Sequence, residues 1–283
     1  MLRSAPLLAI CAACSIPEDD KAAAPDRAYA TQTAAPMPDY RALLVQPSLA
    51  RADRRERKAA ISPPPPDAKA VGELWLSRLQ ERGALLGHGI AGKGSDGPVD
   101  LIDAGLTEAE FMGWAGENGW RVPTHIRWSF VPAMALPPVG EAAKNAIRIW
   151  PASRARTGMQ HQALFHGRVE LRNGCFFVGQ FGGQADTLAW FHAEIGLDKD
   201  ASGYFILRDR ISGQTLARLG EEMNWGGPAT AQIAPQTERV LREACGPAEI
   251  YVVGSPQAKE RMLTQYPHLR TLQSPPPPPA DAR

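Results

Sequence analysis

The amino-acid sequence predicts an α+β protein with N-terminal helices, then a small antiparallel β meander that forms a barrel or sandwich, then a helix-strand-helix end. Two patterns lead to this class. Apolar residues recur at helical spacing within 67–123 and again after 235, whereas short alternating segments bounded by glycine turns lie between them. With 283 residues, 44% of them hydrophobic, the chain has the composition of a globular protein with one main core.

The charge balance argues against one broad class of function. Lysine and arginine total 31 against 30 aspartate and glutamate residues, so the formal net charge is +1. A chain this close to neutrality has no strong overall field that would attract nucleic acid or an anionic membrane. We therefore expect no nucleic-acid partner.

Residues 1–14 have the outline of a bacterial lipoprotein signal peptide. Arg3 precedes a short apolar run, and two alanines then precede Cys14 as in a lipobox. The run is too short for the roughly 20 residues of a transmembrane helix. We predict that Cys14 is acylated and holds the protein at a membrane of the bacterial cell envelope, facing the periplasm or the cell surface. Cys11 stands where leucine is usual, so an ordinary cleaved secretory signal is the alternative.

Residues 15–66 and 271–283 are predicted to be disordered. The first segment is rich in Ala, Pro, Asp and Arg and ends in four prolines, so it cannot bury enough apolar surface to offset its ordering entropy. We expect it to be a tether between the anchor and the folded body, with a short helix around 40–58. The second segment carries the proline run 275–279 and is expected to be a stiff, disordered tail.

Residues 67–123 are predicted to form a helical subdomain. Apolar residues recur at helical spacing from Val71 to Leu86, behind Asp67, which is a suitable N-cap. The glycine-rich stretch 87–95 follows this helix. We expect it to be a flexible loop between two helices.

The second helix has the clearest local signature in the chain. Thr107 is followed three residues later by Glu110, which is the spacing of a capping box. Phe111 and Trp114 supply an apolar face, and Asn118 with the glycine after it is a typical stop signal.

Residues 124–270 are predicted to form a β-rich domain with C-terminal helices. Alternating or apolar segments are separated by glycine turns at a spacing typical of antiparallel barrels and sandwiches. The expected strands are 125–131, 146–150, 164–171, 175–178, 187–191, 204–208, 215–219 and 250–253. Helices are expected at 237–244 and 256–266, on either side of the last strand.

The two cysteines of the folded part, Cys175 and Cys245, are predicted to form a disulfide. An exported protein with two body cysteines is expected to pair them, here across a loop of about 70 residues. The alternative is a catalytic thiolate, which would need a free cysteine that oxidising conditions remove.

One turn of the β-rich domain imitates a calcium loop. Asp198, Asp200 and Ser202 place side-chain oxygens at the first, third and fifth positions, and a glycine follows. The flanks are predicted strands instead of helices, and Asp209 stands where a bidentate glutamate is expected. A hairpin turn is therefore the preferred interpretation, with Ca²⁺ binding as the alternative.

Three aromatic residues, Trp190, Tyr204 and Trp225, are candidates for a ligand surface, because aromatic rings stack on the flat faces of sugars and bases. Alternation along the strands places some of them on a core face, so core packing is the competing interpretation. No motif assigns a catalytic, cofactor-binding or metal-binding residue.

Two short motifs combine glycine with aromatic residues: Gly-Cys-Phe-Phe at 174–177 and Trp-Gly-Gly-Pro at 225–228. With them, the segment 126–267 resembles a family of uncharacterised bacterial envelope lipoproteins. The resemblance implies a shared β fold and again the pairing of Cys175 with Cys245. It implies no activity, ligand or catalytic residue.

We therefore expect a bacterial envelope lipoprotein whose non-catalytic domain binds or scaffolds an unidentified envelope protein or glycan. The alternative is a periplasmic hydrolase or glycan-active enzyme that uses a carboxylate, Glu194 or Glu221, near His192. A concave pocket lined by several of these polar groups would favour the enzyme, whereas a filled barrel with a flat aromatic surface would favour binding.

Overall fold

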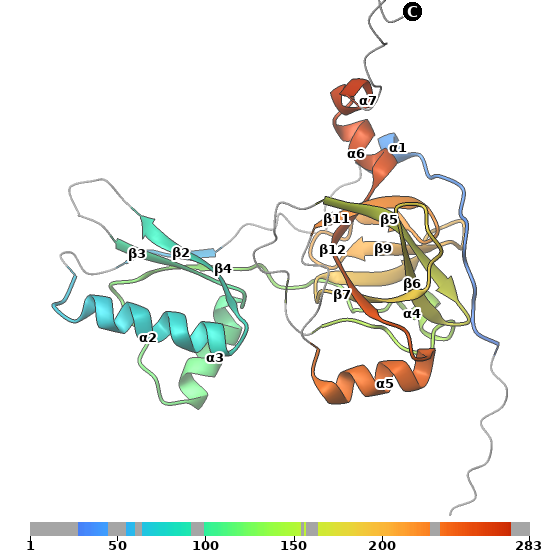
Figure 1. Cartoon of the computed structure of the whole chain (residues 1–283). Coiled ribbons are helices and arrows are strands. Elements are labelled where there is room, and N and C mark those ends of the chain that lie inside the picture. The colour runs from blue at the N-terminus through green and yellow to red at the C-terminus, as the bar shows by residue number, and fades with distance from the viewer. Residues whose placement is uncertain are drawn as a thin grey trace, which may run out of the picture.

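The computed structural model describes residues 28–44, 55–59, 64–91, 99–153, 156, 164–226 and 233–272. These residues form an N-terminal α/β unit and a larger unit built around a closed β-barrel, and residues 131–138 connect the two (Figure 1). The predicted α+β class is confirmed.

Several predictions for the ends of the chain fall on residues that the structure does not describe. The signal segment 1–14 with Cys14, the first part of the tether at 15–27, and most of the tail at 273–283 lie outside the described residues. Within the described part, no helix has the length and apolar character needed to cross a bilayer.

The N-terminal unit is a four-stranded sheet with two helices on one face (Figure 1). The strand order is β1-β4-β3-β2, in which β3 and β4 are parallel and the other pairs antiparallel. The strands are β1 (Arg55–Arg57), β2 (Leu85–Ala91), β3 (Val99–Ala104) and β4 (Arg127–Phe130), and the helices are α2 (Ala68–Glu81) and α3 (Glu108–Glu117).

Aromatic rings pack together in the core of this unit. Trp75 of α2 and Phe111 of α3 pack with ring centroids 5.3 Å apart, and Phe111 also lies 4.7 Å from Trp128 of β4. All three side chains are at most 1% exposed. α3 begins at the predicted capping box, since Thr107 Oγ1 accepts the Glu110 N–H and the Glu110 carboxylate accepts the Thr107 N–H.

The prediction of a purely helical subdomain over 67–123 is wrong. The helix that was expected to reach 86 ends at Glu81, and the expected loop at 87–95 begins within β2, which pairs with β3. Alternating glycines in β2 conceal its strand character, because they supply no apolar or β-branched side chain. The predicted boundary at 124 is also wrong, because β4 completes the sheet of this unit.

The second unit contains a closed barrel with the order β11-β12-β7-β6-β5. β12 and β7 are parallel and every other neighbouring pair is antiparallel, which is the strand arrangement of an OB-type barrel. The strands are β5 (Leu164–Arg172), β6 (Cys175–Gln180), β7 (Thr187–Phe191), β11 (Glu222–Gly226) and β12 (Ile250–Ala258). The predicted meander thus forms a barrel.

A second, antiparallel sheet is inserted between β7 and β11. It has the order β10-β9-β8 and consists of β8 (Ile195–Lys199), β9 (Phe205–Asp209) and β10 (Thr215–Arg218). Its buried residues share the barrel core, among them Leu197, Leu207 and Ala217. The strand predicted at 146–150 is wrong, since these residues are irregular and follow the short helix α4 (Glu141–Lys144).

Helix α5 (Pro235–Cys245) covers the outer face of β6, β7 and β12 (Figure 1). The predicted disulfide is confirmed, because Cys175 at the start of β6 is bonded to Cys245 at the end of α5, with a Cα–Cα distance of 5.6 Å. Leu241 is the buried residue of this helix and packs against Leu188, Trp190 and Val252. The bond and this small cluster hold α5 on the barrel.

Residues 28–44, which we call the strap, run along the outside of the barrel and end in α1 (Tyr40–Leu44) (Figure 1). Gln32 forms a two-way antiparallel bridge with Leu171 of β5, and α1 packs against α6 (Lys259–Gln265). The predicted disordered tether over 15–66 is therefore wrong for the strap and for β1. Backbone hydrogen bonds to neighbouring strands stabilise these two segments, which have few apolar side chains to bury.

The C-terminal end follows the predicted helix-strand-helix order. β12 is longer than the predicted strand 250–253, so the last helix begins at Lys259 instead of 256. The terminal helix α7 (His268–Leu272) includes the first two residues of the predicted tail.

Candidate ligand-binding site

The outer face of β6 and β7 is not an open binding surface. OB-type barrels bind oligonucleotides and oligosaccharides on the face of their second and third strands. Here those strands are β6 and β7, and α5 packs on them. A binding site in this protein is therefore sought elsewhere on the barrel unit.

The three aromatic candidates do not form a ligand surface. Trp190 is 8% exposed beneath α5, and Trp225 is 1% exposed in the core. Tyr204 is partly exposed and lies beside Arg218, whose guanidinium is 4.8 Å from the ring. The prediction of a shared aromatic surface is wrong, because helix α5 and barrel closure cover the two tryptophans.

The calcium-like segment forms a hairpin turn. Asp200 Oδ1 accepts the N–H groups of Ser202 and Tyr204 at 2.9 and 3.0 Å, and its Oδ2 accepts Arg218 Nε at 2.6 Å. Asp198 pairs with Arg208. Within the described part of the chain, no group of three or more His, Cys, Asp or Glu side chains converges as metal ligands.

The three residues proposed for the enzymatic alternative, His192, Glu194 and Glu221, do not form one site. His192 interacts with Glu194, and burial lowers the pKa of His192 although Glu194 acts in the opposite direction. Glu221 instead accepts hydrogen bonds from the Tyr40 hydroxyl and from the Arg218 N–H. The structure thus joins His192 to Glu194 and gives Glu221 different partners.

A pocket of 400 Å³ lies where the β8–β9 pair meets the end of β12 and the start of α6. We call it the β9–β12 pocket. The β8–β9 register pairs Ile195 with Asp209, so Glu194 and Asp209 lie close together at the same end of this sheet. The polar residues of its lining come from β9, β12 and α6 and from the turns that precede β8 and β10: Glu194, Asp209, Gln214, Ser255, Gln257 and Arg261.

A β-bulge directs part of β12 toward this pocket. β11 pairs Asn224 with Gln257 and Gly226 with Gly254, so two residues of β12 lie opposite one residue of β11. The bulged residue Ser255 has a φ of 46°, a conformation uncommon for a residue other than glycine. Such strain is concentrated at functional sites, and this bulge places Ser255 and Gln257 in the pocket wall.

The floor of the pocket is organised by a buried arginine. Arg261 is 9% exposed, and its guanidinium donates to the Thr215 carbonyl at 2.9 Å and to Gln214 Oε1 at 2.8 Å. Burial lowers the pKa of Arg261, and attraction by Tyr40 and Asp209 opposes that shift. The Gln214 carboxamide therefore has its oxygen held by Arg261, which orients the amide group.

Asp209 is mainly a turn residue. Its Oδ1 accepts the Ile211 N–H at 2.9 Å and its Oδ2 accepts the Ser212 hydroxyl at 2.6 Å. Each carboxylate oxygen has capacity for a second hydrogen bond, so Asp209 is fixed in place and still able to accept from a ligand.

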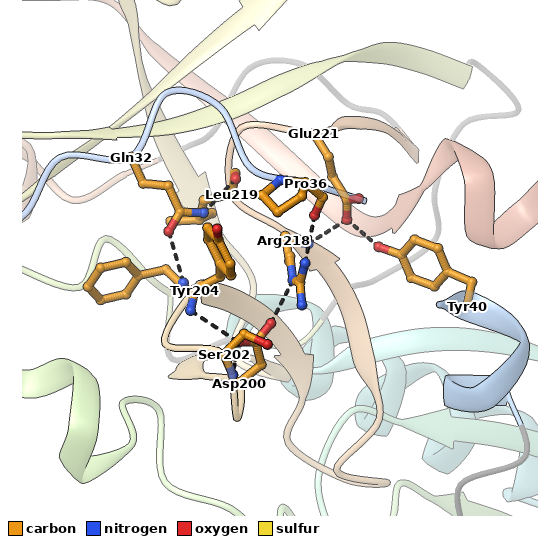
Figure 2. Close-up of polar contacts among 10 residues, drawn as sticks. Gln32, Pro36, Tyr40, Asp200, Ser202, Tyr204, Arg218, Leu219 and Glu221 are labelled. Atoms are coloured by element: carbon orange, nitrogen blue, oxygen red, sulfur yellow. Dashed lines mark hydrogen bonds and ion pairs between the residues drawn. The ribbon is translucent and has the colours of Figure 1, made fainter. Parts of the chain in front are cut away.

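The strap packs against α6, the helix that contributes Arg261 to the pocket. Figure 2 shows the polar contacts of the strap, in which Gln32 donates to the Leu219 carbonyl at 2.7 Å and accepts the Phe205 N–H at 3.0 Å. Tyr40 of α1 donates to Glu221, and burial raises the pKa of both groups. Because α1 packs on α6, the strap and Arg261 share one packed layer.

A larger cavity of 610 Å³ lies beside the disulfide. Three of its charged lining side chains already have partners within the protein. Arg148 donates to the Ala244 carbonyl at 3.2 Å, and the Arg172 guanidinium lies 4.3 Å from the Phe177 ring. Glu243 lies 3.9 Å from Arg239. We therefore regard the β9–β12 pocket as the better candidate.

Comparisons with protein-family models, with curated proteins and with solved structures found no match to this chain.

Proposed function

We propose that this protein is a lipid-anchored protein of the bacterial cell envelope that binds a neutral, polyhydroxylated ligand, such as a glycan segment, in the β9–β12 pocket. The observation that carries the proposal is the mixed set of hydrogen-bonding groups on the pocket wall. The wall of this one small space includes two residues with carboxylates, Glu194 and Asp209, two with carboxamides, Gln214 and Gln257, and Arg261.

This set of groups favours a sugar over a charged ligand. An anion would be repelled by the two carboxylates, whereas Arg261 partly offsets the attraction that these carboxylates exert on a cation. Hydroxyl groups both donate and accept hydrogen bonds, so vicinal hydroxyls suit carboxylates, carboxamides and a guanidinium together. Ile211, Leu216 and Pro256 add apolar wall for the carbon face of a ring, and 400 Å³ is within the range of small-molecule sites.

An envelope location is supported by two independent features. A disulfide between Cys175 and Cys245 is expected in an oxidising compartment, and the lipobox-like segment ends at Cys14. Fourteen residue steps separate Cys14 from Ala28 at the start of the strap. An acylated Cys14 would therefore hold the strap within about 50 Å of the bilayer, the greatest length of such a segment.

The binding test uses the mature protein and calorimetric titration with soluble oligosaccharides: chitotetraose, maltotetraose and a glycan strand released from peptidoglycan. We expect one of these glycans to bind, and Gln257→Ala to weaken it about fivefold, as for loss of one hydrogen bond of about 1 kcal/mol. Glu194→Ala should weaken it roughly 10- to 150-fold, because hydrogen bonds to charged groups contribute about 1.5–3 kcal/mol.

Matched controls are available on the N-terminal unit. Gln80 and Glu117 are exposed helix residues outside the pocket, so Gln80→Ala and Glu117→Ala should bind like the wild type. Equal binding by the pocket variants and these controls would contradict the proposal. Cleavage of a bound glycan that is lost in Glu194→Ala would replace it with the enzymatic alternative, in which Glu194 acts beside His192.

A further inference from the structure

A second pocket lies at the junction of the two units, and its most unusual residue is Arg156. This arginine is partly buried, yet it makes no hydrogen bond or ion pair with any residue of the described part of the chain. Burial lowers its pKa, and longer-range attraction by Glu110, Glu194 and Asp209 opposes that shift. Among the described residues, this guanidinium has lost hydration without gaining a direct hydrogen-bonding partner, which suits it to bind an anion.

The pocket around Arg156 has a volume of 430 Å³. We call it the junction pocket. Its walls are largely apolar, with Leu86 from β2, Leu106 from the segment between β3 and α3, and Met134 from the connection between the units. Arg82, which follows α2, is the second cation on the wall, and Glu110 is the one carboxylate among its described lining residues.

Glu110 does not neutralise both arginines. Its carboxylate already accepts the Thr107 N–H and the Thr107 hydroxyl, each at 2.8 Å, as part of the capping box of α3. The hydrogen bonds from Thr107 lower the pKa of Glu110 against the effect of burial, so it stays ionised. Among the described lining residues, two guanidiniums stand against one carboxylate, so the lining carries an excess of positive charge, which Glu194 and Asp209 outside the pocket partly offset at Arg156.

We propose that the junction pocket binds a small amphiphilic anion, with a carboxylate or phosphate group on Arg156 and Arg82 and a short apolar body between Leu86, Leu106 and Met134. Arginine is well suited to this role because its planar fork matches such oxygen groups. The ligand would contact the N-terminal unit together with the segments that carry Met134 and Arg156. Its lining residues are distinct from those of the β9–β12 pocket, although Glu194 and Asp209 of that pocket attract Arg156, and neither proposal depends on the other.

The test is a calorimetric titration of the mature protein with four probes: hexyl phosphate, hexanoate, inorganic phosphate and hexan-1-ol. We expect hexyl phosphate or hexanoate to bind at least tenfold more tightly than inorganic phosphate and hexanol. The stronger of the two charged probes identifies the head group. Binding no tighter than that of phosphate or hexanol would overturn the proposal, because the charged and apolar parts of the pocket would not act together.

Variants separate the two parts of the site. Arg156→Gln should weaken the charged amphiphile at least tenfold, whereas Arg121→Gln, which changes an exposed arginine of the N-terminal unit, should leave it unchanged. Met134→Ser should weaken the amphiphile and leave phosphate binding as it is. Thermal unfolding of each variant checks that the fold is intact, and wild-type affinity in a folded Arg156→Gln protein would refute the site.

Discussion

Replacing Cys175 and Cys245 together with alanine removes the covalent link between α5 and the barrel. The bond closes a loop across 70 residues of sequence, for which the chain-entropy model gives about 4 kcal/mol of stabilisation at 25 °C. Without the bond, α5 is held by the buried Leu241 and by the hydrogen bond from Arg148 to the Ala244 carbonyl at 3.2 Å. These contacts are too few to replace the bond.

We therefore expect the double variant to lose about 4 kcal/mol of unfolding free energy, within the usual range of about 2–5 kcal/mol. At roughly 2–4 °C per kcal/mol, the thermal midpoint of the barrel unit should fall by about 8–16 °C. Differential scanning calorimetry and urea denaturation measure the two quantities. The N-terminal unit, which the bond does not touch, serves as the internal control.

Two further measurements complete this test. A dithiol reductant should lower the wild-type midpoint by a similar amount and leave the double variant unaffected. Hydrogen exchange should become faster in α5 and in β7, which α5 covers. A midpoint change of less than about 2 °C, or two free body thiols in the unreduced, denatured wild type, would refute the reasoning.

Three other predictions follow from the structure. Gly167→Ala would place a Cβ 2.1 Å from the Gly179 carbonyl oxygen, so urea denaturation should report a loss of about 3 kcal/mol of unfolding free energy. In the control Gly113→Ala, in α3, the new Cβ meets no atom within 4 Å, so this variant should be tolerated. Burial raises the pKa of Glu221 above its usual 4.5. The contribution of Glu221 to the unfolding free energy is therefore present below about pH 4.5 and is lost as the pH rises through the pKa of the folded state. Glu221→Gln should remove this pH dependence of the unfolding free energy, as measured by unfolding at a series of pH values. Intact-mass analysis of protein extracted from the envelope should find a diacylglyceryl group at Cys14 and no residues 1–13, and a mature protein that begins elsewhere would contradict the anchor.

Local sequence signals predicted the parts of the fold that depend on local chemistry. The capping box at Thr107 fixes the start of α3, and alternation predicts β5, β6 and β7 close to their observed bounds. β2 was missed because its glycines hide the pattern, and the strap was missed because its order comes from pairing with β5, 139 residues away between Gln32 and Leu171. Long-range pairing of this kind leaves no local trace.

The candidate site was predictable only in fragments. Glu194 was identified as a polar candidate, but Gln214, Gln257 and Arg261 come from the turn before β10, from β12 and from α6, and they share no spacing in the sequence. The Ser-Pro pair at 255–256 interrupts an apolar strand and is the one local signal of the bulge. The prediction of an exposed aromatic surface was wrong because sequence alternation separates the two faces of a strand but does not predict which face a helix will cover.

The strap links the predicted anchor to the pocket, and Gln32 is the residue on which this link can be tested. Its carboxamide satisfies the Leu219 carbonyl and the Phe205 N–H, so Gln32→Ala leaves two partly buried backbone groups without partners, each at a cost of about 1–3 kcal/mol. We expect the strap to detach before the barrel unfolds. Hydrogen exchange should then become faster at the Leu171 and Gly174 amides, which donate to the strap carbonyls of Gln32 and Ala30.

The matched control is Thr33→Ala, which changes an exposed neighbour of Gln32 and should leave both amides protected. Because α1 packs on α6, detachment of the strap should also weaken glycan binding in the β9–β12 pocket, through looser packing around Arg261. Faster exchange with unchanged glycan affinity would separate the two effects, and it would mean that the strap positions the barrel near the membrane without supporting its pocket. Unchanged exchange at both amides would show that backbone pairing alone holds the strap.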